Sequence, residues 1–386
     1  MSNSVPGYSA ADLADRGATW TVREIVQQPS VWMSVAQLIV NERGRLDAFL
    51  QPLLENPALR IILSGAGTSA FIGDCLAPSL ACQLGRRTES IATTDIVSGP
   101  QLHLRADVPT LLISFARSGN SPESIAAVEL AEQIVPGIRH LVITCNPEGQ
   151  LAARAWSLRN ALVLILPDPA NDRGFAMTSS FTSMLLAAGL IFGTIRAEKV
   201  PILTRAAQAL LPRAWRLAQK LVAGEFQRVV YLGSNELRAL ASEAALKLLE
   251  LTDGRTVSLS QSALGFRHGP KTIVNDKTLV VVMLSNRDYT RDYDLDLLAE
   301  LKRDGRAGEI VALTPRVGEV DGEQVFLGEM EDARDIELAL LHILPAQAFA
   351  LLQSLALGLT PDKPNAAGVV NRVVQGVNIY PYREAR

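Results

Sequence analysis

The sequence predicts an α/β protein made of two similar halves, each with a parallel sheet flanked by helices. Short, almost wholly apolar runs alternate with helix-like segments, which is typical of strands buried on both faces. This series occurs twice, and the first run of each half ends in a comparable turn, Ser64-Gly-Ala-Gly-Thr-Ser69 and Gly233-Ser-Asn-Glu236. Of the 386 residues, 48% are hydrophobic and 20% are charged, so the chain can bury a large core.

The predicted elements follow the chain in order. Apolar residues at helical spacing predict a helical segment over residues 1–50. The first domain, residues 51–200, is expected to contain strands at 60–64, 110–114, 140–144 and 161–166. The second, residues 201–360, is expected to contain strands at 228–232, 255–259, 278–284 and 309–313, after a helical stretch around 181–222. Residues 361–386 contain Pro and Asn and are expected to form an irregular arm.

Charge and cysteine usage exclude several classes of function. The 37 basic and 40 acidic residues give a net charge of −3 with no basic cluster, so no nucleic-acid partner is expected. Cys75, Cys82 and Cys145 form no CxxC pair and have no histidine at metal-binding spacing. No metal site is therefore expected, and the sparse cysteines fit a reducing compartment.

One stretch, residues 338–359, resembles a membrane span in length and hydropathy. It contains His342, Pro345 and two glutamines, and no basic residue closes either end, so a buried helix is the better interpretation. The N-terminus has no basic segment followed by an apolar run, and no signal peptide is expected. We therefore expect a cytoplasmic protein without a membrane partner. The apolar helix and the helical N-terminus are expected to supply contacts in a homodimer or higher homo-oligomer.

The turn after the first predicted strand, Gly65-Ala-Gly67-Thr-Ser-Ala70, formally matches the GxGxxA dinucleotide fingerprint. A dinucleotide fold also needs an acidic residue at the end of the second strand. The corresponding stretch, residues 88–94, does not have the pattern of a strand ending in an acid. An NAD site is therefore disfavoured.

A second turn of the same kind lies at the end of another predicted strand, Ser114-Phe-Ala-Arg-Ser-Gly-Asn-Ser-Pro-Glu-Ser124. Ser121 suits a helix N-cap, and Pro122 suits the first helical position. N–H groups and hydroxyls of the turn before them can then point at one anion, with the helix dipole behind it. The two turns together predict a phosphate site, although each alone could be an ordinary capped turn. No Walker A motif occurs, which disfavours nucleotide hydrolysis.

With these loops the sequence resembles the sugar isomerase (SIS) family of phosphosugar-binding domains, as two tandem SIS domains over about residues 50–360. The stretch Leu264-Gly-Phe-Arg-His-Gly-Pro-Lys271 and the tail from Asp362 to Val377 are similar to the AgaS-type subgroup. That subgroup is described as galactosamine-6-phosphate deaminase/isomerases, or as tagatose-6-phosphate ketose/aldose isomerases. The resemblance implies a hexosamine or hexose 6-phosphate substrate. It implies that the substrate is bound by Gly67, Thr68, Ser69, Arg117, Ser118, Gly119, Ser121 and Arg372.

Three charged residues, Glu243, Lys247 and Glu250, fall at i, i+4 and i+7 on one face of a predicted helix. Such spacing usually marks a solvated stripe, but the surrounding sequence ALASEAALKLLEL is apolar on nearly all sides and predicts burial. The same positions, followed by His268-Gly-Pro270, resemble the isomerase half of glucosamine-6-phosphate synthase. No amino-terminal cysteine or glutaminase domain is found, so free ammonia rather than glutamine is expected.

The resemblance implies a reaction without metal or organic cofactor. His268 opens the sugar ring, since histidine titrates near neutrality. Glu250 moves a proton between C2 and C1, with Lys247 and Glu243 beside it, and water hydrolyses the resulting ketimine. The synthase also uses a tail lysine, but no lysine follows Lys363 here.

Three functions stay open from the sequence. An amino-sugar 6-phosphate deaminase/isomerase leads, ahead of a simple tagatose-6-phosphate isomerase. A non-catalytic phosphosugar sensor is less favoured, because a sensor needs neither Glu250 nor His268. The choice between galacto and gluco substrates is not encoded in these motifs.

Overall fold

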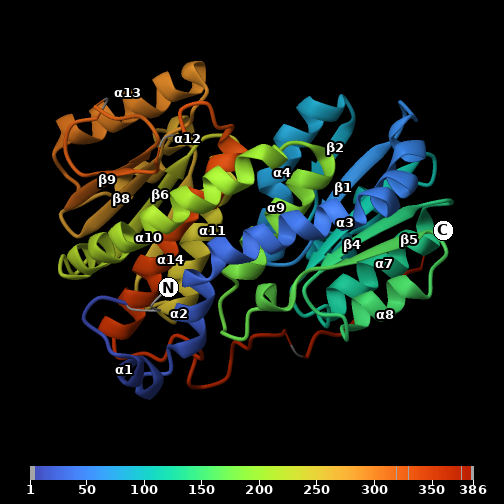
Figure 1. The fold of residues 1–386 in the computed structure, drawn as a ribbon, viewed down its shortest axis with the longest axis horizontal. Helices are drawn as coiled ribbons and strands as arrows, with labels where there is room; N and C mark the ends of the chain where they lie inside the picture. The colour runs from blue at the N-terminus through green and yellow to red at the C-terminus, as the bar shows by residue number, and fades with distance from the viewer. Residues whose placement is uncertain (1–4, 319, 329, 375, 384–386) are drawn as a thin grey trace. The chain divides into compact units, whose positions relative to one another are not determined.

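The computed structural model describes residues 5–318, 320–328, 330–374 and 376–383, and it contains two parallel five-stranded sheets (Figure 1). The chain forms two compact units that are not consecutive in sequence. Unit 1 comprises residues 1–33, 172–179 and 195–366, and unit 2 comprises residues 34–171, 180–194 and 367–386. Each unit holds one sheet flanked by helices, so the predicted α/β fold with two parallel sheets is confirmed.

Unit 2 is built on a sheet with the strand order β2-β1-β3-β4-β5. Its strands are β1 (Arg60–Ser64), β2 (Arg87–Ser90), β3 (Thr110–Ala116), β4 (Arg139–Thr144) and β5 (Ala161–Ile165). Its helices are α4 (Thr68–Leu84), α5 (Thr93–Ser98), α6 (Pro100–His103), α7 (Pro122–Ile134), α8 (Gln150–Trp156) and the 3₁₀ turn η1 (Asp168–Ala170). α4 packs against β1 and β2, whereas α7 and α8 lie together along the sheet (Figure 1). α3 (Gln28–Leu54) and α9 (Ser179–Phe192) each have residues in both units.

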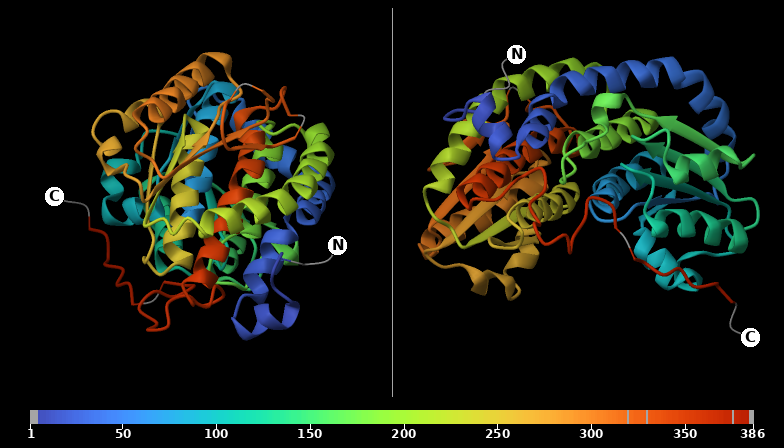
Figure 2. Two further views of the ribbon diagram at one scale, coloured as in Figure 1. Left: turned by 90° about the vertical axis from the view of Figure 1, so that its left-hand side faces the viewer. Right: turned by 90° about the horizontal axis from the view of Figure 1, so that it is seen from below.

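Unit 1 repeats this order as β7-β6-β8-β9-β10. Its strands are β6 (Arg228–Gly233), β7 (Val257–Gln261), β8 (Thr278–Met283), β9 (Glu309–Thr314) and β10 (Gln324–Phe326). Its helices are α1 (Ala10–Asp15), α2 (Thr19–Val26), α10 (Val200–Val222), α11 (Glu236–Leu251), α12 (Ala263–Phe266), α13 (Asp288–Asp304), α14 (Asp335–Ala356), η2 (Ala197–Lys199) and η3 (Pro270–Ile273). α11 packs against β6, β7 and α14, and Figure 2 shows α13 (orange) on the side of the strands away from α14 (red).

The continuous apolar runs became strands as predicted. β1 and β3 are buried along their whole length, which is why their sequences do not alternate. Two strands were not predicted: β2, whose residues Arg87–Ser90 are polar and partly exposed, and the short β10. Residues 88–90 do form part of a strand, but it ends at Ser90, so the expectation that this stretch is not a strand ending in an acidic residue is not contradicted. β7 begins at Val257 rather than at the predicted residue 255.

The apolar stretch at residues 338–359 forms most of α14, and every residue from Asp335 to Leu355 is buried. Among the described residues, this is the single helix long and apolar enough to cross a membrane, and its apolar window is wholly covered by the protein. The prediction of a buried helix is confirmed. The expectation that it supplies subunit contacts is wrong, because α14 packs inside unit 1 against α10 and α11.

The first turn of each sheet has the same backbone conformation. Gly67 before α4 has φ 56° and ψ −128°, and Asn235 before α11 has φ 52° and ψ −118°. Gly65 and Gly233 pass so close to the following helix that an added Cβ would lie 2.5 Å from its backbone. The similarity of the two turns in the sequence therefore reflects a shared strand–turn–helix geometry.

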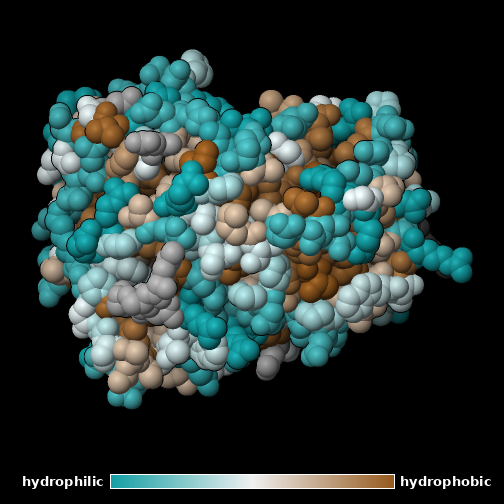
Figure 3. Space-filling model, in the orientation of Figure 1, coloured by the Kyte–Doolittle hydropathy of each residue, from teal (hydrophilic) through white to brown (hydrophobic). Residues whose placement is uncertain are grey.

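The surface seen in Figure 3 is largely hydrophilic over α13 and shows hydrophobic side chains in the region of α3. The large hydrophobic side chains exposed on α3 are Met33 and Val40, which are 42% and 65% exposed.

Three carboxylates gather in unit 1, on α2, on the loop before α9 and after α14. Glu24 accepts hydrogen bonds from the backbone N–H groups of Arg173 (2.5 Å) and Gly174 (3.2 Å). Asp172 accepts one from a backbone N–H of its own loop at 2.7 Å, and Asp362 accepts two from the start of α2 at 3.0 and 2.8 Å. Burial, followed by the charges of Asp172 and Asp362, raises the pKa of Glu24 to about 8.

Replacing Glu24 with glutamine is expected to stabilise the protein at alkaline pH. The pKa of Glu24 in the folded protein lies above its ordinary value of 4.5. The stability contributed by the protonated carboxyl group is therefore fully present below pH 4.5 and is lost as the pH rises through about 8. Glutamine imitates the protonated acid, so the free energy of unfolding of E24Q should exceed that of the parent by on the order of 3 kcal/mol above about pH 8. Urea unfolding from about pH 5 to about pH 9 measures this difference.

The matched control is Glu129→Gln on α7, whose carboxylate is 58% exposed. It should leave the pH dependence of unfolding unchanged. A gain in E24Q that is the same at every pH would contradict the assignment to the carboxyl proton.

Candidate active site

The strand order of unit 2 places a ligand site at the carboxyl ends of β1 and β3. These strands are neighbours, with Ser64 opposite Ser114, and their connections leave toward opposite sides of the sheet. Ligands of open α/β sheets bind at such a topological switch point. The two loops predicted to bind phosphate both follow these strands. The structure thus brings residues 67–69 and residues 117–121 to the same edge of one sheet.

The first loop, named the β1 loop, runs from Gly65 to Gly67 and ends at the start of α4. Its positive φ at Gly67 favours glycine there. Thr68 and Ser69 are the first residues of α4, and both are buried. The unpaired N–H groups of a helix N-terminus, together with two hydroxyls, form a typical environment for an anion.

The second loop, named the phosphate loop, comprises residues 117–121 between β3 and α7. Gly119 has φ +65°, and the Ser118 hydroxyl accepts a hydrogen bond from the backbone N–H of Asn120 at 3.3 Å. Ser121 occupies the N-cap position of α7, as predicted, followed by Pro122. Its hydroxyl, however, forms a 2.6 Å hydrogen bond with the Ser124 hydroxyl and caps no backbone N–H.

The C-terminal segment reaches the phosphate loop through a backbone contact. Arg117 is buried, and its guanidinium donates a 2.8 Å hydrogen bond to the carbonyl oxygen of Arg372. Farther along, Tyr382 packs against the core cluster of unit 2. The backbone of Arg372 therefore lies beside the phosphate loop, while its side chain is exposed.

In unit 1, α11 carries the predicted catalytic charges on a buried face. Lys247 Nζ lies 3.5 Å from Glu243 Oε1 and forms an ion pair with Glu250 Oε2. Glu243 and Lys247 are fully buried, and the Glu250 side chain is 25% exposed. The second oxygen of Glu250 has no hydrogen-bond partner within the described part of the chain. This arrangement presents a carboxylate with one oxygen held by a buried lysine and the other available to accept a proton.

His268 lies in the exposed turn between α12 and η3, also in unit 1. Gly269 after it has φ +117°, and the imidazole has no hydrogen-bond partner among the residues that the structure describes. On either side the turn is fixed to α13, because Arg267 and Lys271 both form ion pairs with Glu300. His268 is therefore exposed to solvent in a turn whose neighbouring residues are fixed to α13 by ion pairs.

Two of the remaining histidines lie in the cores. His140 on β4 is hydrogen-bonded to Glu132 at 2.7 Å, and burial lowers the pKa of its imidazole. Burial, and then the charge of Arg291, lowers the pKa of His342 on α14 to about 3. His103 lies at the end of α6.

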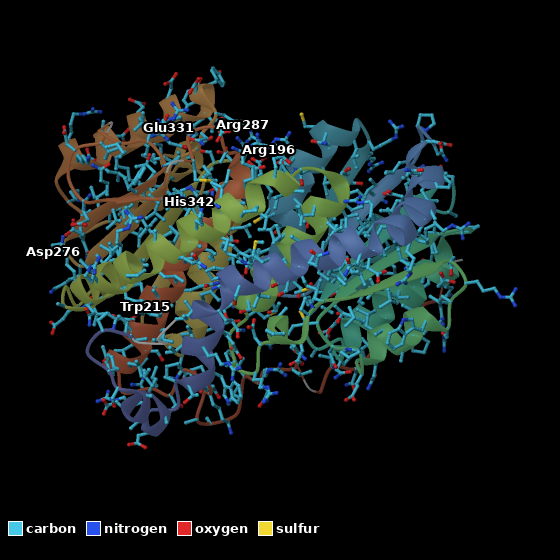
Figure 4. All side chains as sticks on the ribbon, in the orientation of Figure 1. Arg196, Trp215, Asp276, Arg287, Glu331 and His342 are labelled. Carbon is cyan, nitrogen blue, oxygen red and sulfur yellow. The ribbon has the colours of Figure 1, made fainter. Side chains whose placement is uncertain are left out.

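The equivalent switch point of unit 1, between β6 and β8, is filled by the protein's own carboxylates. Glu236, at the start of α11, is buried and bound by both terminal nitrogens of Arg287 at 2.6 and 2.5 Å. Arg287, which Figure 4 labels, also lies 3.2 Å from Asp335. Nearby, Asp294 accepts a 2.6 Å hydrogen bond from the Ser234 hydroxyl. Carboxylate oxygens thus already engage the hydroxyl and guanidinium groups that could hold an anion at this turn.

The sequence reasoning missed one residue at the unit 2 site, Asn146 in the loop after β4. Its side-chain amide donates a 2.8 Å hydrogen bond to the Ser118 carbonyl oxygen. The stretch Thr144-Cys-Asn-Pro-Glu-Gly149 has the composition of a turn, and this is the one signal that could have indicated it. Within the described residues, no group of three or more His, Cys, Asp or Glu side chains is placed to hold a metal ion.

Comparison with known proteins gives consistent matches over nearly the full chain. A family model of the SIS domain matches residues 54–193. D-galactosamine-6-phosphate deaminase AgaS of Escherichia coli is 47% identical over 370 residues, covering 95% of this chain and 96% of that protein. The protein of the same name from Shewanella sp. (strain ANA-3) is 47% identical over 379 residues, covering 97% and 95%.

Solved structures agree with these relatives. The crystal structure of tagatose-6-phosphate ketose/aldose isomerase from Escherichia coli superposes with a TM-score of 0.89 at 44% identity, covering 97% of this chain and 100% of that chain. At such identity and coverage, both sheets and the helices around them have counterparts in a single relative. The chain therefore belongs to the AgaS family of SIS-domain proteins.

Proposed function

We propose that this chain is a galactosamine-6-phosphate deaminase/isomerase, which converts galactosamine 6-phosphate and water to a ketohexose 6-phosphate and ammonia. The observation that carries the proposal is the 47% identity to the Escherichia coli deaminase over 95% of this chain. The Glu243–Lys247–Glu250 cluster on α11 agrees with it, because a buried charged cluster is costly to keep unless it is paired or used.

In the proposed reaction, unit 2 binds the 6-phosphate. Thr68, Ser69, Ser118 and Ser121 contribute hydroxyls, and the starts of α4 and α7 contribute N–H groups and favourable helix dipoles. Arg117 adds a positive charge beside the phosphate loop. These groups offer the phosphate several hydrogen-bond donors and one positive charge.

The proton chemistry is assigned to His268 and Glu250. His268 moves the proton of the anomeric hydroxyl to the ring oxygen, which opens the sugar to its aldehyde form. Glu250 then removes the proton from C2, and the electron pair of that bond forms an enolamine. Returning the proton to C1 gives a ketimine at C2, so no net oxidation or reduction occurs. Lys247 orients the Glu250 carboxylate through the ion pair.

Hydrolysis completes the deamination. Water adds to the C2 carbon of the ketimine, a proton moves to the nitrogen, and the C–N bond breaks as ammonia leaves. The C2 carbonyl of the ketohexose 6-phosphate remains. A simple aldose–ketose isomerase uses the same proton transfer with oxygen in place of nitrogen and needs no hydrolysis.

The test is ammonia release from purified protein given galactosamine 6-phosphate or glucosamine 6-phosphate, beside interconversion of tagatose 6-phosphate. We expect ammonia from galactosamine 6-phosphate, at a rate at least about tenfold above that from the gluco epimer, a ratio that a well-placed polar contact supplies. Unphosphorylated galactosamine is the control and should release none.

The second candidate function is tagatose-6-phosphate ketose/aldose isomerisation, which the description of the Escherichia coli crystal structure favours. Turnover of tagatose 6-phosphate without ammonia from either amino sugar would establish it and reject the deaminase. Phosphosugar binding without any turnover would instead support a sensor.

We also propose that the protein is a homodimer or larger homo-oligomer in the cytoplasm. Support comes from Met33 and Val40, two large hydrophobic side chains exposed on α3. Light scattering on the purified protein gives the subunit number, and a mass of one chain would reject this part of the proposal.

A further inference from the structure

The loop after β4 forms hydrogen bonds with the phosphate loop of unit 2. The Asn146 side-chain amide donates to the carbonyl oxygen of Ser118 at 2.8 Å. Asn146 is itself fixed in a tight turn, because its Oδ1 accepts a hydrogen bond from the Glu148 N–H at 3.1 Å and its own N–H donates to the Thr144 hydroxyl at 3.3 Å. The direction of the Asn146 amide is therefore set before any ligand arrives.

Two further hydrogen bonds tie the next two residues of the phosphate loop to the start of α8. The Leu151 N–H donates to the Gly119 carbonyl oxygen at 2.9 Å, and the Gln150 N–H donates to Asn120 Oδ1 at 3.0 Å. Three consecutive residues, 118 to 120, are thus each held by the segment from residue 146 to residue 151. The phosphate loop is fixed by its neighbour rather than by its own sequence alone.

This anchoring sets the direction of the N–H groups. In a planar trans peptide the carbonyl and the following N–H point to opposite sides. With the Ser118 and Gly119 carbonyls turned toward Asn146 and Leu151, the N–H groups of Gly119 and Asn120 are turned away from the β4 loop, and that of Asn120 also contacts the Ser118 hydroxyl at 3.3 Å. Successive N–H groups around a residue with positive φ, here Gly119, form the concave arrangement that binds anions.

The contact between the two loops also requires a glycine. A Cβ on Gly149 would lie 2.6 Å from the Ser118 oxygen and 3.2 Å from the Gly119 Cα. Gly149 has φ −69°, an ordinary value for any residue. Close approach of the phosphate loop, rather than backbone conformation, is therefore what excludes a side chain at this position.

We propose that Asn146 is a positioning residue for phosphate recognition: it does not touch the substrate, but its amide fixes the Ser118 carbonyl and thereby presents the N–H groups of the phosphate loop to the 6-phosphate. This inference rests on the proposed function and names the loop that makes the site rigid. It assigns Asn146 to binding and not to proton transfer.

The test measures binding and turnover in Asn146→Ala and Asn146→Asp. Aspartate keeps the Oδ1 acceptor but cannot donate to Ser118, and it adds a negative charge at the same place. We expect KM for galactosamine 6-phosphate to rise about tenfold in N146A, which is the usual cost of one lost hydrogen bond, with kcat changed less than about threefold. N146D should lose more, because its charge opposes the phosphate. The inhibition constant of inorganic phosphate should rise by the same factor as KM.

The matched control is Asn56→Ala, since Asn56 Oδ1 accepts a similar turn hydrogen bond from the Ala58 N–H at 3.0 Å, before β1. It should change neither KM nor phosphate inhibition. A fall in kcat at constant KM, or unchanged phosphate binding in both Asn146 variants, would overturn the assignment.

Titration of the parent protein with inorganic phosphate, followed by phosphorus NMR, separates this inference from the proposed function. It requires no catalysis. If the parent binds phosphate and the variants bind it equally well, the role of Asn146 is rejected while the phosphosugar function stands. If the parent binds no phosphate at all, both are rejected.

Discussion

Replacing Glu250 with glutamine is expected to lower kcat for ammonia release by about 10² to 10⁴-fold, the usual contribution of a positioned general base. Glutamine has the same shape and can still accept a hydrogen bond from Lys247, but it cannot take the C2 proton. The dissociation constant for galactosamine 6-phosphate should change less than about threefold, since the proposal assigns phosphate binding to other residues, those of the β1 loop and the phosphate loop. Steady-state kinetics and calorimetric titration measure the two quantities.

The control is Glu198→Gln, an exposed carboxylate in the η2 turn of the same unit. It should leave both quantities unchanged. Retention of kcat within about threefold in E250Q would remove Glu250 from the reaction, because a true proton shuttle cannot be replaced by an amide.

Replacing Lys247 with methionine should give the largest loss of stability, about 3–5 kcal/mol in the free energy of unfolding. Lys247 is fully buried and lies between the carboxylates of Glu243 and Glu250. Methionine fills the same space but leaves two negative charges without their cation, one of them fully buried. Urea unfolding of the variant measures the loss.

A second substitution and a surface pair test the cause of this loss. Adding Glu243→Gln to K247M removes the buried uncompensated charge and should recover more than half of the lost stability. Lys220→Met breaks the pair with Glu323 in which the lysine is 55% exposed, and it should cost less than about 1 kcal/mol. Equal stability of K247M and the parent would show that Lys247 does not stabilise the protein through its contacts with Glu243 and Glu250.

The strands that could be predicted are those buried on both faces. β1 and β3 have mostly apolar sequences because both strands are buried along their whole length. β2 has the sequence RTES and lies at the edge, where Glu89 is exposed enough to pair with Arg87 at 2.9 Å as well as with the buried Arg60. β2 forms because its backbone pairs with that of β1. This pairing does not require a regular pattern of apolar residues in the sequence of β2.

The site was predictable where its geometry is local. The spacing of Glu243, Lys247 and Glu250 determines a common helix face, and the apolar residues between them indicate its burial. The contacts of Asn146 with Ser118, and of Arg117 with Arg372, join residues that are 28 and 255 positions apart. No sequence periodicity reports such contacts, because they arise only when the sheet brings separate loops to one edge.

The carboxylates at the turn of unit 1 have a consequence for how the two halves respond to solution conditions. Glu236 and Asp335 are covalently part of the chain, so Arg287 meets a saturating anion at any dilution. In the proposed reaction, the equivalent turn of unit 2 takes its anion from solution, as the phosphate group of the substrate. By mass action, each tenfold excess of ligand over its dissociation constant adds about 1.4 kcal/mol to the folding of the half that binds it. On that proposal, substrate supply sets the stability gained from the anion in unit 2, whereas the carboxylates beside Arg287 are present at every substrate concentration.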